Sequence, residues 1–204
     1  MDVKHAAARK SFELAFSGVY KYINKNKEEN LVKLMNLAHK IAGKNFPQYF
    51  WDNANEVLGD PEQKWTQMIY NAMDRLHPNI VKQHVLNMGF EAGLTGFKKV
   101  RENREKYGCN VPWVILMDPT SACNLRCTGC WAAEYGYKLN LTYEELDDIV
   151  TQGKELGIYF YMFTGGEPLV RKADILKLCK KHHDVAFHSL SLIHISEPTR
   201  HAQI

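Results

Sequence analysis

The strongest constraint on the fold is a change of hydrophobic period at Gly108. Beyond this residue, short apolar runs of strand length alternate with segments that have the helical period. The strands are expected at residues 111–117, 159–163 and from 185 to about 188, and the helices between them at residues 141–157 and 171–182. Strands that alternate with helices in this way form a parallel sheet. The sequence therefore predicts an α/β fold, with a β-α-β-α-β unit over residues 109–189.

Residues 1–108 are expected to form an all-α helical region. Apolar side chains recur there at intervals of three and four residues, as on one face of an amphipathic helix. Asp60 and Pro61 have the residue types of a helix start, with Trp65 and Met68 on the predicted inner face. Helices are expected near residues 12–23, 31–41, 47–58, 61–76, 78–90 and 94–107. No catalytic motif occurs in this half, and binding of a partner is its alternative role.

Composition excludes several classes of protein. Hydrophobic residues make up 45% of the 204 residues, which is enough for a packed core and argues against disorder. The formal net charge of +3 gives no sign of a nucleic-acid or anionic-membrane partner. No apolar run has the length of a membrane span, and charged residues interrupt the first twenty positions as they would not in a signal peptide. A cytoplasmic location is therefore expected.

Three of the five cysteines lie within eight residues, between the first strand and the following helix: Cys123, Cys127 and Cys130. Thiolates so closely spaced are typical of iron-sulfur or zinc sites. Three thiolates would leave one iron of a 4Fe-4S cluster without a protein ligand, and this open iron is a binding site. The alternative is a four-ligand zinc site with Cys109, but a seven-residue strand of roughly 20 Å separates Cys109 from the loop. Cys179 is expected in the core.

Two motifs carry a resemblance to a known family. They are Asp118-Pro119-Thr120-Ser121-Ala122-Cys123-Asn124-Leu125-Arg126-Cys127-Thr128-Gly129-Cys130-Trp131, and Thr164-Gly165-Gly166-Glu167-Pro168 after the second strand. Together they resemble the radical S-adenosylmethionine (radical SAM) superfamily. The resemblance implies the N-terminal part of a partial (β/α)6 TIM-like barrel, preceded by the helical region.

The resemblance also implies the cofactors. The three cysteines would bind a 4Fe-4S cluster, whose fourth iron is chelated by the methionine part of S-adenosylmethionine (SAM). The backbone near Trp131 would lie beside the adenine. Gly165 and Gly166 would let the backbone approach SAM, and Glu167, followed by Pro168, would accept hydrogen bonds from the methionine ammonium. No side chain is assigned as catalytic, because the cofactors carry the chemistry.

In this family the reduced cluster cleaves SAM, and a 5′-deoxyadenosyl radical abstracts hydrogen from a substrate. The substrate here is an unidentified small molecule or peptide, and no residue selects among the molybdopterin-biosynthesis, peptide-modifying and hopanoid-modifying branches. A reductant such as flavodoxin or ferredoxin is the implied partner, with neither nucleic acid nor membrane. The alternative is a non-catalytic iron-sulfur or zinc-binding module, which iron and sulfide analysis would distinguish.

The last residues, 190–204, have no periodic pattern. They resemble a translated sequencing adapter, which predicts a non-native tail with no part in the fold. On this interpretation the chain is a radical SAM core that is truncated after about three βα units.

Overall fold

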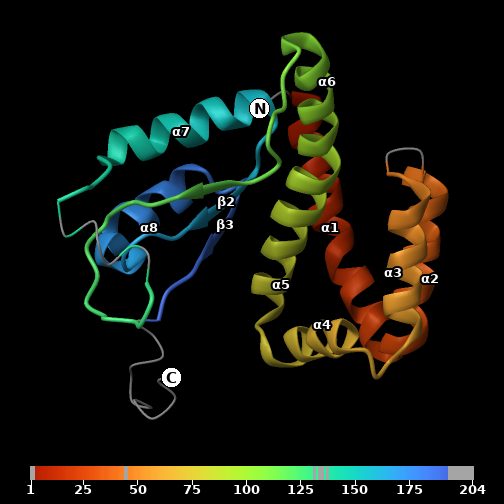
Figure 1. Cartoon of the computed structure of the whole chain (residues 1–204). Coiled ribbons are helices and arrows are strands. Elements are labelled where there is room, and N and C mark those ends of the chain that lie inside the picture. The colour runs from red at the N-terminus through yellow and green to blue at the C-terminus, as the bar shows by residue number, and fades with distance from the viewer. Residues whose placement is uncertain (1–2, 44–45, 131, 133–135, 137, 193–204) are drawn as a thin grey trace. The chain divides into compact units, whose positions relative to one another are not determined.

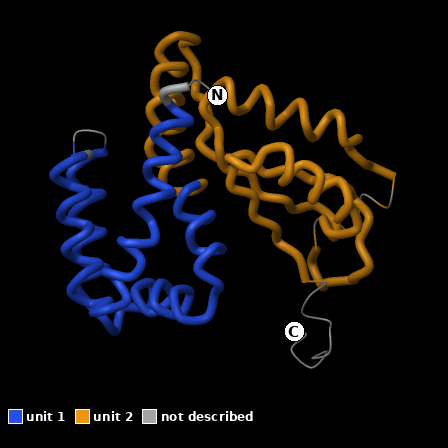
Figure 2. The backbone as a smooth tube through the Cα atoms, turned by 180° about the vertical axis from the view of Figure 1, so that it is seen from behind, with its two compact units in different colours: residues 1–86 blue, residues 87–204 orange. Residues whose placement is uncertain are grey.

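The computed structural model describes residues 3–43, 46–130, 132, 136 and 138–192. The chain forms two compact units, Met1–Leu86 and Asn87–Ile204 (Figure 2). Residue 108, where helix was expected to give way to strand, lies inside the second unit. None of the described helices is long and apolar enough to cross a membrane.

The first unit consists of helices in which each packs against the next along the chain. They are α1 (Val3–Lys25), α2 (Lys27–Ala42), α3 (Gln48–Gly59), α4 (Lys64–Arg75) and α5 (Pro78–His84). Trp51 is buried in the unit, and its ring stacks on that of His39 with centroids 4.7 Å apart. The expectation of a helical N-terminal region is confirmed.

Helix α4 begins later than the sequence predicts, and only part of the predicted inner face is buried: Met73, also expected inside, is a core residue. Asp60 accepts a hydrogen bond from the amide of Glu62 in a turn, and the side chain of Gln63 then caps the helix that begins at Lys64. Trp65 and Met68, expected inside, are each 53% exposed. The buried line of the helix instead includes Thr66, whose hydroxyl donates to a carbonyl oxygen of α3. This hydrogen bond lets a polar residue occupy the inner face.

A helical stretch that continues into the second unit is unbroken where two separate helices were expected. A π-helical segment, η2 (Val85–Gly96), runs directly into α6 (Phe97–Tyr107). Three glycines within eight residues, at positions 89, 93 and 96, suggest a break in the sequence. The backbone widens to a π-helix there instead, and Ala92 and Val100 from this stretch join the core of the unit.

The sheet has three parallel strands in the order β1 (Ile115–Met117), β2 (Phe160–Phe163) and β3 (Ala186–Ser189) (Figure 1). Helix α7 (Tyr143–Leu156) connects the first two strands. The short 3-10 helix η4 (Pro168–Arg171) and α8 (Lys172–Lys181) connect the last two. A capping box between Thr142 and Glu145 starts α7, and Gly157 ends it, both as expected. The predicted β-α-β-α-β order and parallel sheet are confirmed.

Helices α7 and α8 pack against one face of the sheet. Tyr161 of β2 is fully buried there, and its ring lies against Gly153 of α7, where any larger residue would collide with it. Asp147 of α7 lies 2.9 Å from the ring nitrogen of His182, directly after α8, which ties the two helices together. This packing fixes β1 and β2 side by side, so the loops that follow them leave from the same edge of the sheet.

Candidate iron-sulfur and cofactor site

The two sequence motifs are joined by backbone hydrogen bonds beyond the ends of β1 and β2. The amide of Gly166 donates to the carbonyl oxygen of Thr120 at 3.0 Å, and the amide of Glu167 to that of Ala122 at 2.8 Å. Ala122 directly precedes Cys123, the first cysteine. The cysteine loop (residues 118–141) and the glycine loop (residues 164–168) therefore form one continuous structure at the carboxyl edge of the sheet, where ligands of parallel α/β folds bind.

Gly166 is required for this docking. A Cβ atom on Gly166 would overlap the carbonyl oxygen of Ala122 and lie 2.7 Å from the carbonyl carbon of Ser121. At Gly165 it would lie 2.8 Å from the Cβ of Asp118, and φ is +97°. The sequence suggested that both glycines leave room for a cofactor. The structure supplies a different reason, because the missing side chains let the two loops touch.

The cysteine loop is closed at its base by a short antiparallel pairing of residues 119–121 with residues 139–141, here called the neck. The amide of Ser121 donates to the carbonyl oxygen of Leu139 at 2.8 Å. The hydroxyl of Thr120 donates to the side-chain oxygen of Asn140 at 2.6 Å. All three clustered cysteines lie between the two sides of the neck. Sequence analysis did not predict this pairing, because neither side has the length or pattern of a strand.

The three cysteines follow one another around a tight turn of the loop. Cys123 and Cys130 are half-buried, and Cys127 is exposed. The amide of Cys130 donates to the carbonyl oxygen of Cys127 at 3.2 Å, and Gly129 between them has φ of +74°, as the tight loop requires. Within the described residues no three His, Cys, Asp or Glu side chains gather closely enough to hold a metal ion. The structure thus places the three thiols on one loop without drawing their sulfur atoms together.

Two adjoining hollows accompany the loops. One, of about 330 Å³, is lined by Cys123 and Cys127, and the other, of about 480 Å³, by Gly165 and Gly166. Ser121 lines both, so the hollow beside the thiols borders the hollow beside the glycine loop. The donor set also fits: soft thiolates are the usual ligands of iron-sulfur clusters.

Glu167 is oriented into the protein. It is only 2% exposed, and its carboxylate accepts hydrogen bonds from the amide of Leu169 at 2.9 Å, the hydroxyl of Ser191 at 2.7 Å and the amide of Leu192 at 3.2 Å. Pro168, also buried, begins η4. The residues expected in a detached tail thus supply two of the donors that hold Glu167.

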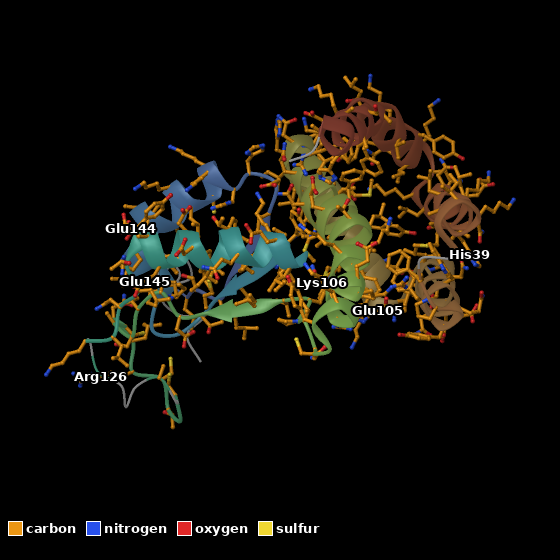
Figure 3. The ribbon with its side chains drawn as sticks, turned by 90° about the horizontal axis from the view of Figure 1, so that it is seen from above. His39, Glu105, Lys106, Arg126, Glu144 and Glu145 are labelled. Carbon is orange, nitrogen blue, oxygen red and sulfur yellow. The ribbon has the colours of Figure 1, made fainter. Side chains whose placement is uncertain are left out.

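The other cysteines lie away from the three-cysteine loop. Trp131 lies outside the described residues. Cys109 is exposed and precedes β1, whereas the cysteine loop follows that strand. Cys179 of α8 packs against the core, and burial raises the pKa of its thiol. Arg126, between the first two clustered cysteines, projects from the loop away from the helices (Figure 3).

Sequence analysis missed Arg171. Its guanidinium donates to the carbonyl oxygen of Leu141 at 2.7 Å, on one side of the neck, and pairs with Asp174 at 2.7 Å. The sequence gives no signal for this contact, because thirty residues separate Arg171 from Leu141 and an arginine before a helix is usually solvated.

The fold and the site together define a class: parallel α/β domains in which a three-cysteine loop is joined to a glycine-rich loop at the carboxyl edge of the sheet. Residues 117–197 match the family described as the Radical SAM superfamily. Members of this superfamily use a 4Fe-4S cluster and SAM. No solved structure matches the chain significantly.

Several curated proteins named GTP 3',8-cyclase are similar to part of the chain. The protein from Petrotoga mobilis is 40% identical over 81 residues, which cover 38% of this chain and 24% of the relative. The protein from Alkaliphilus oremlandii is 52% identical over 56 residues, or 26% of this chain and 18% of the relative. The protein from Geobacter sulfurreducens is 47% identical over 62 residues, or 28% and 19%. The chain thus matches about a quarter or less of the length of these relatives.

Proposed function

We propose that Cys123, Cys127 and Cys130 bind a 4Fe-4S cluster and that SAM binds beside it at the glycine loop. The observation that carries this proposal is the hydrogen bond from Glu167 to the carbonyl of Ala122, next to Cys123. It brings the two motifs to one edge of the sheet. When bound, the two cofactors supply one-electron reductive cleavage of SAM, which is the superfamily's means of abstracting hydrogen from a substrate.

The protein's own residues bind and orient in this proposal. The three thiolates hold three irons and leave the fourth open to the amino and carboxylate groups of SAM. Because the Glu167 carboxylate is held by protein donors, its task is to anchor the glycine loop. The backbone carbonyls of that loop are then the acceptors for the methionine ammonium. The close contact of Gly166 with the backbone of Ser121 and Ala122 keeps the two loops at a fixed separation, which would orient the ligands for reaction.

The proposal also concerns the substrate. The relatives' name makes GTP the first compound to test, but the similarity covers only the segment with the cofactor motifs. A small electron-transfer protein of the flavodoxin or ferredoxin type is the proposed reductant, in the cytoplasm, where thiols stay reduced.

Anaerobic reconstitution with iron and sulfide tests the metal site. The protein should take up four irons and four sulfides per cluster. Replacing any one of Cys123, Cys127 or Cys130 by Ala should abolish retention of the cluster. Cys109→Ala and Cys179→Ala are matched controls that should retain it. Loss of the metal with Cys109→Ala, or uptake of zinc in preference to iron, would support the non-catalytic alternative.

Reductive cleavage is tested on the loaded protein with SAM and dithionite, with and without GTP. Release of 5′-deoxyadenosine and methionine supports the enzymatic proposal. A loaded protein that neither binds nor cleaves SAM supports a cluster with a structural or electron-transfer role.

A further inference from the structure

The side chain of Arg171 connects the end of η4 to both sides of the neck. Its Nη1 donates to the carbonyl oxygen of Leu141 at 2.7 Å and to that of Pro119 at 3.4 Å. Its Nε donates to Asp174 at 2.8 Å, which holds the guanidinium in place. The side chain is 21% exposed, so these contacts are largely shielded from water.

The two carbonyl acceptors lie at the two ends of the cysteine loop. Pro119 comes four residues before Cys123, and Leu141 comes eleven residues after Cys130. A group that binds both carbonyls closes the loop that carries all three thiols. The planar guanidinium has several donors in fixed directions, so a single Arg171 side chain can bind the neck and Asp174 at once, which a lysine cannot do.

Arg171 is also attached closely to the glycine loop. It ends η4, and Glu167 caps the start of η4 through the amide of Leu169. Arg171 is therefore a further connection between the two loops, in addition to the hydrogen bonds from Gly166 to Thr120 and from Glu167 to Ala122. The two backbone bonds hold residues 120–122, whereas Arg171 also holds Leu141 on the other side of the neck.

We propose that Arg171 is a positioning residue that fixes the cysteine loop relative to the glycine loop, and thereby sets the separation of the cluster from SAM. The inference rests on the proposed function. A purely local role, as an ion pair with Asp174 at the start of α8, is the competing interpretation. Such partly exposed pairs contribute little to stability.

Hydrogen exchange on the protein without cofactors tests the inference directly. The amides of Gly166 and Glu167 donate to the cysteine loop, so their exchange reports whether the two loops stay docked. Arg171→Ala should speed exchange at these amides by roughly tenfold, the value of one hydrogen bond from a charged donor. Asp174→Asn, which removes the ion pair but keeps the guanidinium on the neck, should change exchange less than threefold or so.

Cofactor binding supplies the second readout. Reconstituted Arg171→Ala should keep the iron content of the unaltered protein, because no thiol is lost, but its Kd for SAM should rise roughly tenfold. Arg171→Lys should be intermediate, since one ammonium can reach a carbonyl or Asp174 but not the whole set. If Arg171→Ala fails to fold, the same two measurements are made on Arg171→Lys.

The outcomes separate the two proposals. If the unaltered protein takes up no iron, the proposed function fails, and the exchange measurement still decides the role of Arg171. If exchange at Gly166 and the Kd for SAM are unchanged in both Arg171 variants, the inference is wrong. It is equally wrong if Asp174→Asn reproduces the full effect, because the ion pair alone would then account for it.

Discussion

The backbone amide of Glu167 donates a hydrogen bond to the carbonyl oxygen of Ala122 over 2.8 Å, and so links two motifs that are 45 residues apart in the chain. Because Ala122 precedes Cys123, the position of the first thiol depends on the position of the glycine loop. The cysteine loop and the glycine loop are therefore mechanically coupled.

Gly166→Ala should disrupt this link. The new Cβ would overlap the carbonyl of Ala122, and a backbone neighbour cannot rotate away as a side chain can. We expect a loss of roughly 1–3 kcal/mol in the free energy of unfolding, as for other overpacked sites, and faster exchange of the Glu167 amide. Urea unfolding and hydrogen exchange measure the two effects.

Gly18→Ala is the matched control. Gly18 lies in α1 with open space around its Cβ position. The substitution should stabilise the helix by about 0.5–1 kcal/mol, because alanine loses less backbone entropy than glycine. Equal destabilisation by Gly18→Ala and Gly166→Ala would contradict the docking role of Gly166.

Local signals explain which parts of the fold the sequence predicts. The capping box at Thr142 and Glu145, the ending of α7 at Gly157 and the apolar run of β2 each depend on neighbouring residues, and all occur as predicted. The two motifs follow consecutive parallel strands, so topology alone brings them to one edge of the sheet.

Long-range polar contacts explain what the sequence does not predict. The bonds from Arg171 to the neck, and from Ser191 to Glu167, join residues at least twenty-four positions apart and have no periodic signature. The face of α4 is partly mispredicted for the same reason, because the hydroxyl of Thr66 binds an acceptor on another helix. The spacing of the cysteines predicts which thiols belong to one site. The directions of their side chains are not predicted, because they depend on a loop without periodicity.

Ser191→Ala should destabilise the second unit. Its hydroxyl donates to the buried carboxylate of Glu167 at 2.7 Å, and Leu190 extends the pairing with β2 through a bond to the carbonyl of Phe163 at 2.9 Å. Loss of one donor to a buried carboxylate should cost roughly 1–3 kcal/mol. This result would contradict the sequence-based expectation that residues 190–204 play no part in the fold.

Thermal unfolding measures this effect, with Ser17→Ala as the control. Ser17 is an exposed hydroxyl on α1, so its removal should leave the Tm unchanged. If Ser191→Ala also leaves the Tm unchanged, residues 190–192 contribute no stability and the original expectation stands.

The ion pair between Lys154 and Asp184 should make the second unit acid-sensitive. Burial alone would raise the pKa of Asp184, but the hydrogen bond and charge of Lys154, at 2.7 Å, lower it below the ordinary value. The stability contributed by this carboxylate is therefore present above its unfolded pKa of about 3.9. It should be lost as the pH falls from there through the lowered folded pKa, which urea unfolding at a series of pH values measures.

Lys154→Met removes the cation and leaves the carboxylate buried. We expect a loss of roughly 2–3 kcal/mol at pH 7, below the usual range for buried pairs because Lys154 is partly exposed. Acid unfolding should then begin at a higher pH. Lys98→Met, which breaks an exposed pair with Glu102, is the control and should change neither value. An unchanged pH profile in Lys154→Met would show that the pair is not what keeps Asp184 ionised.

The two cysteines outside the loop should differ in reactivity. Burial raises the pKa of the Cys179 thiol above its ordinary value of 9.0, whereas Cys109 is exposed. Because the thiolate is the reactive form, Cys179 should react with iodoacetamide at least about tenfold more slowly than Cys109 at pH 8. Its rate should continue to rise above pH 9, since a raised pKa leaves much of the thiol protonated there.

Peptide mapping by mass spectrometry follows each site, and Cys179→Ser should remove the slow phase. Equal rates at the two sites would mean that α8 opens freely and that Cys179 is not a core residue.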